Sequence, residues 1–129
     1  MPQNSALLYE YSETAPKTLS DVLLVELNPQ WCREEAYLAP AAVDMPLGAV
    51  VAVNDDGNYV PYLSAAGDNQ AKAVLMTPKK ANPAAQKCVV LRRGVKVAAS
   101  GLAFLDAVTG EQKQTAYSQL TELGIVVEE

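Results

Sequence analysis

The stretch LGAVVAVNDDGNYVPYL, residues 47–63, constrains the fold of this chain more than any other. Residues 48–53 are apolar and rich in β-branched side chains, and the apolar pattern resumes at residues 59–63 after a cluster of turn-forming residues. An Asp-Gly pair between two such runs is a strong β-hairpin signal, because glycine accepts the positive φ that a turn between twisted strands requires. Asp56 and Gly57 are therefore predicted to form the structural turn of a hairpin, around which a small β-rich domain assembles.

The composition favours one globular domain and argues against catalysis. The chain has 129 residues, half of them hydrophobic, which is enough to bury a core. It contains no histidine, the commonest general base and metal ligand. Cys32 and Cys88 lie far apart and are expected to be free thiols, since they match neither a zinc spacing nor a disulfide framework. No phosphate loop, nucleophile elbow or calcium-loop spacing occurs in the sequence, so we predict no enzymatic activity, no cofactor and no metal.

The N-terminal residues, the length of the apolar runs and the net charge indicate where the protein is located and which partners it can bind. Residues 1–17 lack a basic region and a long apolar core, so no signal peptide is expected. No apolar run approaches the roughly 18 residues that a membrane helix needs. The net charge of −5 argues against a nucleic-acid partner, for which a basic face is expected. We therefore expect a chain that is made in a cytoplasm, leaves it only within a larger assembly, and binds neither membrane nor nucleic acid.

Charge is unevenly distributed along the chain. Residues 70–105 hold seven of the ten basic residues and no acidic residue. One interpretation is a solvated strand face that keeps the sheet soluble. The other is an inter-subunit surface that meets acidic groups on a neighbouring copy or partner, where complementary charge sets register more than affinity. The candidate residues for this basic surface are Lys72, Lys87, Arg92, Arg93 and Lys96.

Further strands are predicted from short apolar runs bounded by turn residues. These runs span residues 22–27, 71–77, 86–92, 95–98 and 125–127, with residues 36–38 as a shorter candidate. Residues 102–105 are open between a strand and a helical turn. Pro61 removes one ladder donor, so the second strand of the hairpin is expected to lie at an edge or to leave the sheet there.

One helix is predicted near the C-terminus. Thr109 and Gln112 have the spacing of a capping box, and Gly124 falls where a left-handed C-terminal cap is expected. Between them, Ala116, Leu120 and Leu123 recur with the period of one helix face. The predicted fold class is therefore α+β. It consists of a compact β-rich domain over residues 21–129 with one short C-terminal helix, preceded by an extended N-terminal arm.

Residues 1–20 form this predicted arm. Polar and proline-containing segments flank one apolar island, whose candidate binding side chains are Leu7, Leu8, Tyr9 and Tyr11. Such a segment is either a frayed tail or a segment that becomes ordered on a partner, and the residues alone leave both open. If the arm becomes ordered on a partner, its removal is expected to leave the stability of the fold nearly unchanged and to weaken binding to that partner.

The order of these pieces resembles the lambda-type head decoration proteins of tailed bacteriophages. The resemblance covers about residues 33–127 and rests on the pieces GAVVA, DGNYVPY, AKAVLM, VVLRRGVKV, LAFL and LTELGIVV in succession. The chain departs from the family at Trp31-Cys32-Arg33, where a small residue and Ser-Arg are frequent. It also has Phe104-Leu105 where a tryptophan is common.

This resemblance implies a viral capsid decoration, or cement, protein. Such a protein binds the outer surface of an expanded phage head at three-fold sites as a homotrimer and stabilises it against the pressure of internal DNA. Its partners would be the major capsid protein of a tailed phage and its own copies, its location the virion, and its arm a strand added to a shell subunit. The alternative is a generic small β-rich binding module that recognises a peptide or a sugar in another assembly.

Overall fold

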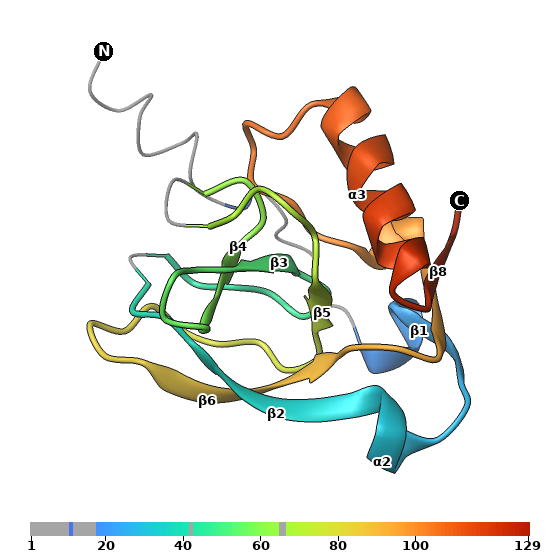
Figure 1. Ribbon diagram of the computed structural model, residues 1–129, viewed down its shortest axis with the longest axis horizontal. Helices are drawn as coiled ribbons and strands as arrows, with labels where there is room; N and C mark the ends of the chain where they lie inside the picture. The colour runs from blue at the N-terminus through green and yellow to red at the C-terminus, as the bar shows by residue number, and fades with distance from the viewer. Residues whose placement is uncertain (1–10, 12–17, 42, 65–66) are drawn as a thin grey trace.

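A closed five-stranded barrel and a three-stranded sheet make up the β-structure of the protein (Figure 1). The structure, a computed structural model, describes residues 11, 18–41, 43–64 and 67–129. The barrel strands, in their order around the barrel, are β2 (Arg33–Leu38), β4 (Tyr59–Pro61), β3 (Val50–Val53), β5 (Ala73–Leu75) and β6 (Gln86–Leu91).

The second sheet has the order β1 (Leu23–Glu26), β7 (Val95–Ala98) and β8 (Ile125–Glu128). β1 pairs with β7 in antiparallel fashion, whereas β8 pairs with β7 in parallel. A parallel pair needs a long crossover connection, which here contains the helix α3 (Gly110–Glu122). Shorter helical turns are η1 (Leu19–Asp21), α2 (Pro29–Cys32) and η2 (Ala99–Gly101). The predicted β-rich fold with a C-terminal helix is confirmed.

The predicted hairpin is formed by β3 and β4. Gly57 has a φ of +83°, as the turn requires. The Asn54 side chain fixes the turn, since its Oδ1 accepts from the backbone N–H groups of Asp56 and Asn58, each at 3.0 Å. Pro61 ends β4, so the chain leaves the strand at the residue that cannot donate to a ladder.

The C-terminal helix begins at the predicted capping box. The Thr109 N–H donates to Oε1 of Gln112 at 2.8 Å, and the Gln112 N–H donates to Oγ1 of Thr109 at 3.2 Å. Ala116 and Leu120 are fully buried. The expectation that Leu123 shares their face is wrong, because the helix ends at Glu122 and Leu123 is 38% exposed.

Two further elements differ from their predicted extents. β2 begins at Arg33 rather than at Ala36, because the polar residues at its start pair with β6 over six positions. Residues 102–105 form neither a strand nor a helix; only Ala103 pairs, through an isolated parallel bridge to Ala49. Both outcomes depend on segments distant in sequence.

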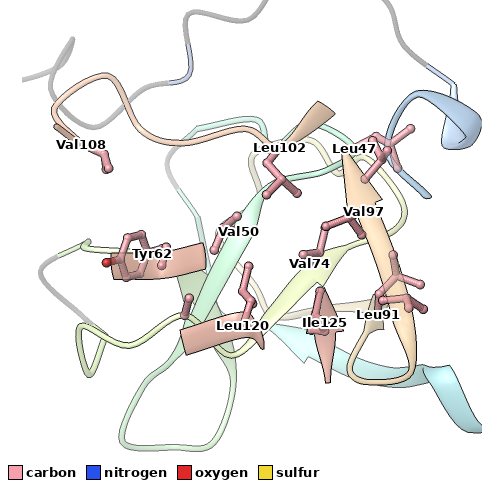
Figure 2. Close-up of a cluster of buried hydrophobic side chains, with 14 of the residues drawn as sticks. Leu47, Val50, Tyr62, Val74, Leu91, Val97, Leu102, Val108, Leu120 and Ile125 are labelled. Carbon is pink, nitrogen blue, oxygen red and sulfur yellow. The ribbon is translucent and has the colours of Figure 1, made fainter. Parts of the chain in front are cut away.

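The strands of the barrel separate two hydrophobic clusters. The large cluster lies between the barrel, the three-stranded sheet and α3, and Figure 2 shows Val50, Val74, Leu91, Leu120 and Ile125 converging there. The barrel cluster is built from the residues adjacent to these on the same strands, Val51, Leu75 and Val90, together with Leu38, Met45 and Tyr59. Successive side chains of a strand point to opposite faces, so β3, β5 and β6 each serve both clusters.

Candidate functional site

Of the four candidate binding side chains of the predicted arm, only Tyr11 lies in the described part of the chain; Leu7, Leu8 and Tyr9 lie outside it. Tyr11 is half-buried and contacts both the large cluster and the barrel cluster. Its hydroxyl is buried with no hydrogen-bond partner among the described residues, and this burial raises the pKa of Tyr11. Residue 11 is therefore held at a fixed place on the domain.

Tyr11 lines a hollow of about 410 Å³ at one end of the barrel, together with Asp44, Met45, Pro46, Pro78, Lys79 and Lys80. Two isolated antiparallel bridges, Ala41↔Asn82 and Met45↔Lys79, join the two loops that form this end. We call it the proline end and define it as residues 39–41, 43–46 and 77–84, which include Pro40, Pro46, Pro78 and Pro83.

Asp44 fixes the rim of the proline end. Its carboxylate accepts from the Ala81 N–H at 2.8 Å and lies 3.5 Å from Nζ of Lys80. The hydrogen bond from Ala81, and next the positive charge of Lys80, hold the pKa of Asp44 below its usual value. The two loops are thus held together by backbone and side-chain contacts.

A second, mainly apolar hollow of about 180 Å³ opens beside the first, and Met45 lines both. We call it the barrel-end hollow. Its lining comprises Ala39, Pro40, Ala41, Val43, Met45, Tyr59, Val60, Pro61, Ser64 and Leu105. The sequence did not reveal this feature, because its walls come from three separate parts of the chain: the loop after β2, β4 with the residues after it, and Leu105.

Asp56 and Gly57 lie exposed at the tip of the hairpin. A Cβ placed on Gly57 would meet no atom within 4 Å. The role of Gly57 visible in the structure is thus conformational.

Three of the five predicted basic-surface residues form ion pairs within the chain. Nη1 of Arg92 lies 2.8 Å from Oε1 of Glu34 and donates to the Tyr59 hydroxyl at 2.9 Å. Nη2 of Arg93 lies 3.5 Å from the other oxygen of Glu34. On the other sheet, Nζ of Lys96 lies 3.1 Å from Oε1 of Glu128.

Lys72 and Lys87, the other two predicted basic-surface residues, form no ion pair within the part of the chain that the structure describes. Lys72 is half-exposed and donates to Oε1 of Gln70 at 3.3 Å. Lys87 is exposed on β6, where it lies opposite Tyr37 of β2. The structure therefore brings Arg92 and Arg93 together on Glu34 but places Lys96 on the three-stranded sheet, apart from Lys87.

An exposed apolar surface on the three-stranded sheet is a second feature that was not predicted from the sequence. Val25, Lys96 and Val126 lie side by side in register across β1, β7 and β8. Six of the seven large apolar side chains that are exposed among the described residues belong to these strands or to the segments next to them. We call them the apolar sheet surface: Leu24, Val25, Leu27, Trp31, Leu123 and Val126. The run VLLVEL carried a signal, since it does not alternate as a half-buried strand would.

Other kinds of site are not found in the described part of the chain. It holds no group of three or more His, Cys, Asp or Glu residues arranged to bind a metal ion. None of its helices is long and apolar enough to cross a membrane.

The family model described as bacteriophage lambda head decoration protein D matches residues 12–125. The chain belongs to this family. Among curated proteins, none matches the chain. The family is structural rather than catalytic, so the protein is not an enzyme. Membership implies decoration of a phage capsid and a place on the capsid surface of the virion, which confirms the resemblance seen in the sequence.

Family membership indicates that the exposed features of the domain are candidate contact surfaces. A decoration protein works by contact, so its functional site is a set of surfaces rather than a cleft with reactive groups. The described residues offer two such surfaces, the proline end with Tyr11 and the apolar sheet surface. In Figure 1 the loop between β5 and β6, which belongs to the proline end, lies at the left, and β1, α2 and β8 lie at the right.

Proposed function

We propose that this protein is a cement protein that binds the outer surface of an expanded phage head at its three-fold sites as a homotrimer and stabilises the head against the pressure of packaged DNA. The observation that carries the proposal is the family match over residues 12–125. The protein is made in the host cytoplasm and reaches the virion by binding the major capsid protein of a tailed phage. It needs neither nucleic acid nor membrane for this.

The apolar sheet surface supports the trimer. Val126 is 45% exposed and Leu27 is 72% exposed, and burying such surface is favourable by roughly 25 cal/mol per Å². Lys96 lies on the central strand of this sheet, between Val25 and Val126, and its charge is paired with Glu128 of the same chain. Exposed apolar side chains gathered on one face of a protein are typical of a contact between subunits. We therefore assign this surface to the contact between copies.

The arm supports the contact with the shell. Leu7, Leu8 and Tyr9 are separated from Tyr11 by one residue or a few, and Tyr11 is fixed to the domain. An extended segment that starts from a fixed point can add as a strand to a shell subunit, where alternate side chains enter pockets. Trimeric display would present three such arms to one site, so that weak single contacts combine by avidity.

The basic surface contributes less to this proposal than the sequence suggested. Arg92, Arg93 and Lys96 have acidic partners in their own chain. Contact with acidic groups of a neighbour would then rest mainly on Lys72 and Lys87. We retain these two as the candidates for charge pairing between subunits.

A coating assay tests the function. Purified protein is mixed with expanded heads of its own phage that lack decoration, with unexpanded heads and with unassembled shell protein, and each mixture is sedimented. We expect saturable binding to expanded heads only, and a higher temperature of head disruption after coating. Failure to bind any head, with binding to a peptide or sugar instead, would favour the generic binding module.

The trimer is tested by a charge placed in the apolar sheet surface. Val126→Asp is expected to weaken association between copies, because a carboxylate in an apolar contact loses its hydration. Sedimentation in solution and the occupancy of three-fold sites on coated heads report the effect. Ser118→Asp, on an exposed position of α3, is the control and should leave both measurements unchanged.

A further inference from the structure

Three buried hydroxyl groups without partners lie at or beside one end of the molecule. These are the hydroxyls of Tyr11, Ser64 and Thr77, which have no hydrogen-bond partner among the described residues. Tyr11 lines the larger hollow of the proline end, and Ser64 lines the barrel-end hollow. Thr77 belongs to the proline end and precedes Pro78, which lines the larger hollow. A buried polar group without a partner is unfavourable, and native proteins rarely keep several close together unless another molecule satisfies them.

The barrel-end hollow has the size and chemistry of a side-chain receptor. Its volume of about 180 Å³ is smaller than the pockets that hold cofactors or metabolites, which are on the order of 300–1,000 Å³. Pro40, Pro61 and Val43 give it an apolar wall, and Ser64 lies in its lining with a hydroxyl that is buried. The hollow therefore fits one aliphatic side chain of a peptide, and rotation of Ser64 about χ1 would bring its hydroxyl to a polar group of that peptide.

The surroundings of the hollow favour insertion of a side chain over addition of a strand. Prolines lack the N–H that strand pairing needs, and four of them lie in the two loops of the proline end. Pro40 and Pro61 line the hollow itself, and their fixed φ angles restrict its shape before binding, which lowers the entropy lost when a partner enters.

We propose that the proline end is a receptor for an extended segment of the shell protein, with an aliphatic side chain of that segment in the barrel-end hollow and a polar group of it on the Ser64 hydroxyl. This rests on the proposed function. The shell protein is the occupant because Tyr11 fixes the start of the proposed shell-binding arm beside the same end, so the arm and the hollow meet one partner. Each partner then binds a segment of the other: the arm adds as a strand to a shell subunit, and a side chain of the shell protein enters the barrel-end hollow.

Ser64→Ala separates this role from a structural one. Removing a buried hydroxyl without a partner raises the melting temperature of the free protein, whereas the same change weakens binding to expanded heads several-fold because the shell segment loses its hydrogen bond. If the Ser64 hydroxyl served only the fold, its removal would not raise the melting temperature and at the same time weaken head binding. Equal head affinity for wild type and Ser64→Ala would contradict the proposed hydrogen bond.

Ala41→Trp tests the hollow itself. Ala41 lines it and is half-exposed, so an indole there fills the space without entering the barrel cluster. We expect head affinity to fall at least tenfold in the co-sedimentation assay, with melting temperature and oligomeric state unchanged. Ser118→Trp, at an exposed position of α3, is the size-matched control and should bind like the wild type.

Hydrogen exchange on the wild-type protein identifies the occupant without a mutation. Binding to heads is expected to protect amides in residues 39–41, 43–46 and 59–64. Protection that appears in the free protein as its concentration rises would assign the hollow to a second copy and overturn the proposal. If wild type binds heads and both variants bind equally well, the receptor proposal fails alone; if wild type binds no head, the proposed function itself fails.

Discussion

The backbone of Gly94 lies against the indole ring of Trp31. A Cβ on Gly94 would be 2.9 Å from Cε3 of Trp31 and 3.0 Å from Sγ of Cys32. The Gly94 carbonyl accepts hydrogen bonds from the Leu27 N–H at 3.1 Å and from the Cys32 thiol at 3.4 Å. The turn between β6 and β7 is thus fixed to the end of β1 and to α2, and it leaves no room for a side chain at position 94.

Gly94→Ala is expected to destabilise the domain by about 2 kcal/mol or more, because a positive φ and a steric clash add. The φ of Gly94 is +67°. Chemical denaturation measures the loss. In the background Trp31→Ala the same substitution should cost less, since the ring that it meets is gone. Strictly additive losses would show that the indole contact is not the cause.

Gly57→Val isolates the conformational part of this effect. Gly57 also has a positive φ, +83°, but an added Cβ meets no atom within 4 Å. A β-branched residue at such a φ is expected to cost about 1 kcal/mol, less than Gly94→Ala. An unchanged denaturation midpoint would mean that the turn readily adopts another conformation.

The ion pair between Glu26 and Arg33 predicts a pH dependence. Nε and Nη2 of Arg33 donate to the two oxygens of Glu26 at 2.6 and 2.8 Å, which holds the pKa of Glu26 below its ordinary value of 4.5. A carboxyl with a lowered folded-state pKa stabilises the fold above the unfolded pKa, and this contribution is lost as the pH falls through the folded value. Glu26→Gln should therefore lower stability at neutral pH by up to about 1 kcal/mol.

Melting curves from neutral to acidic pH measure this contribution. The melting temperatures of wild type and Glu26→Gln are expected to converge below the ordinary pKa of the glutamate, as the pair is lost from the wild type. Glu122→Gln, at an exposed position of α3, serves as the control and should follow the wild type throughout. Parallel curves for wild type and Glu26→Gln would exclude a contribution from the pair to acid lability.

Local signals carried most of the correct sequence-based predictions. The Asp56-Gly57 turn and the Thr109/Gln112 capping box involve residues within a few positions of each other, and both appear as expected. The start of β2 was missed because Arg33 and its polar neighbours gain strand structure only from pairing with β6, a segment distant in sequence. Pairing of this kind leaves no periodicity in the strand itself.

Contacts between segments that are distant in sequence also determine which candidate surfaces are exposed, and they could not be predicted from the sequence. The acid-free stretch of residues 70–105 suggested a basic surface without acidic partners. Glu34, which precedes this stretch in the sequence, and Glu128, which follows it, nevertheless form ion pairs with its basic residues. Neither partner can be located without the sheet registers. The family, by contrast, was recognisable from the order of its pieces, because that order follows from the fold as a whole.

Salt dependence is expected to separate paired from unpaired basic residues. Exposed charges are screened over about 10 Å at 0.1 M salt, so a contribution of Lys87 to head binding should shrink as salt rises. Lys87→Gln is expected to flatten the salt dependence of head binding, whereas Arg92→Gln should leave it unchanged, since Arg92 pairs with Glu34 of its own chain. Co-sedimentation at a series of salt concentrations measures both. A flat response in the wild type would identify the basic residues as a solvated face.

The final prediction concerns where the arm ends. Tyr11 contacts both clusters, and Leu19 of η1 contacts the large one, so removing residues 1–20 would also remove packing from the domain. Deletion of residues 1–10 is therefore the cleaner test, and it should leave the melting curve unchanged while sharply weakening binding to expanded heads.

Deletion of residues 1–17 should weaken head binding to the same degree and also lower stability by about 1–2 kcal/mol. This cost is below that of truncating a fully buried aromatic residue, because Tyr11 is half-buried and its hydroxyl has no partner among the described residues. Tyr11→Phe, which keeps the ring, should melt at or above the wild-type temperature. If the protein that lacks residues 1–10 coats heads as well as the full chain, the arm is only a tail and the domain alone captures the shell. If the protein that lacks residues 1–17 melts like the wild type, the contacts of Tyr11 with the two clusters add nothing to stability, and the arm extends beyond it.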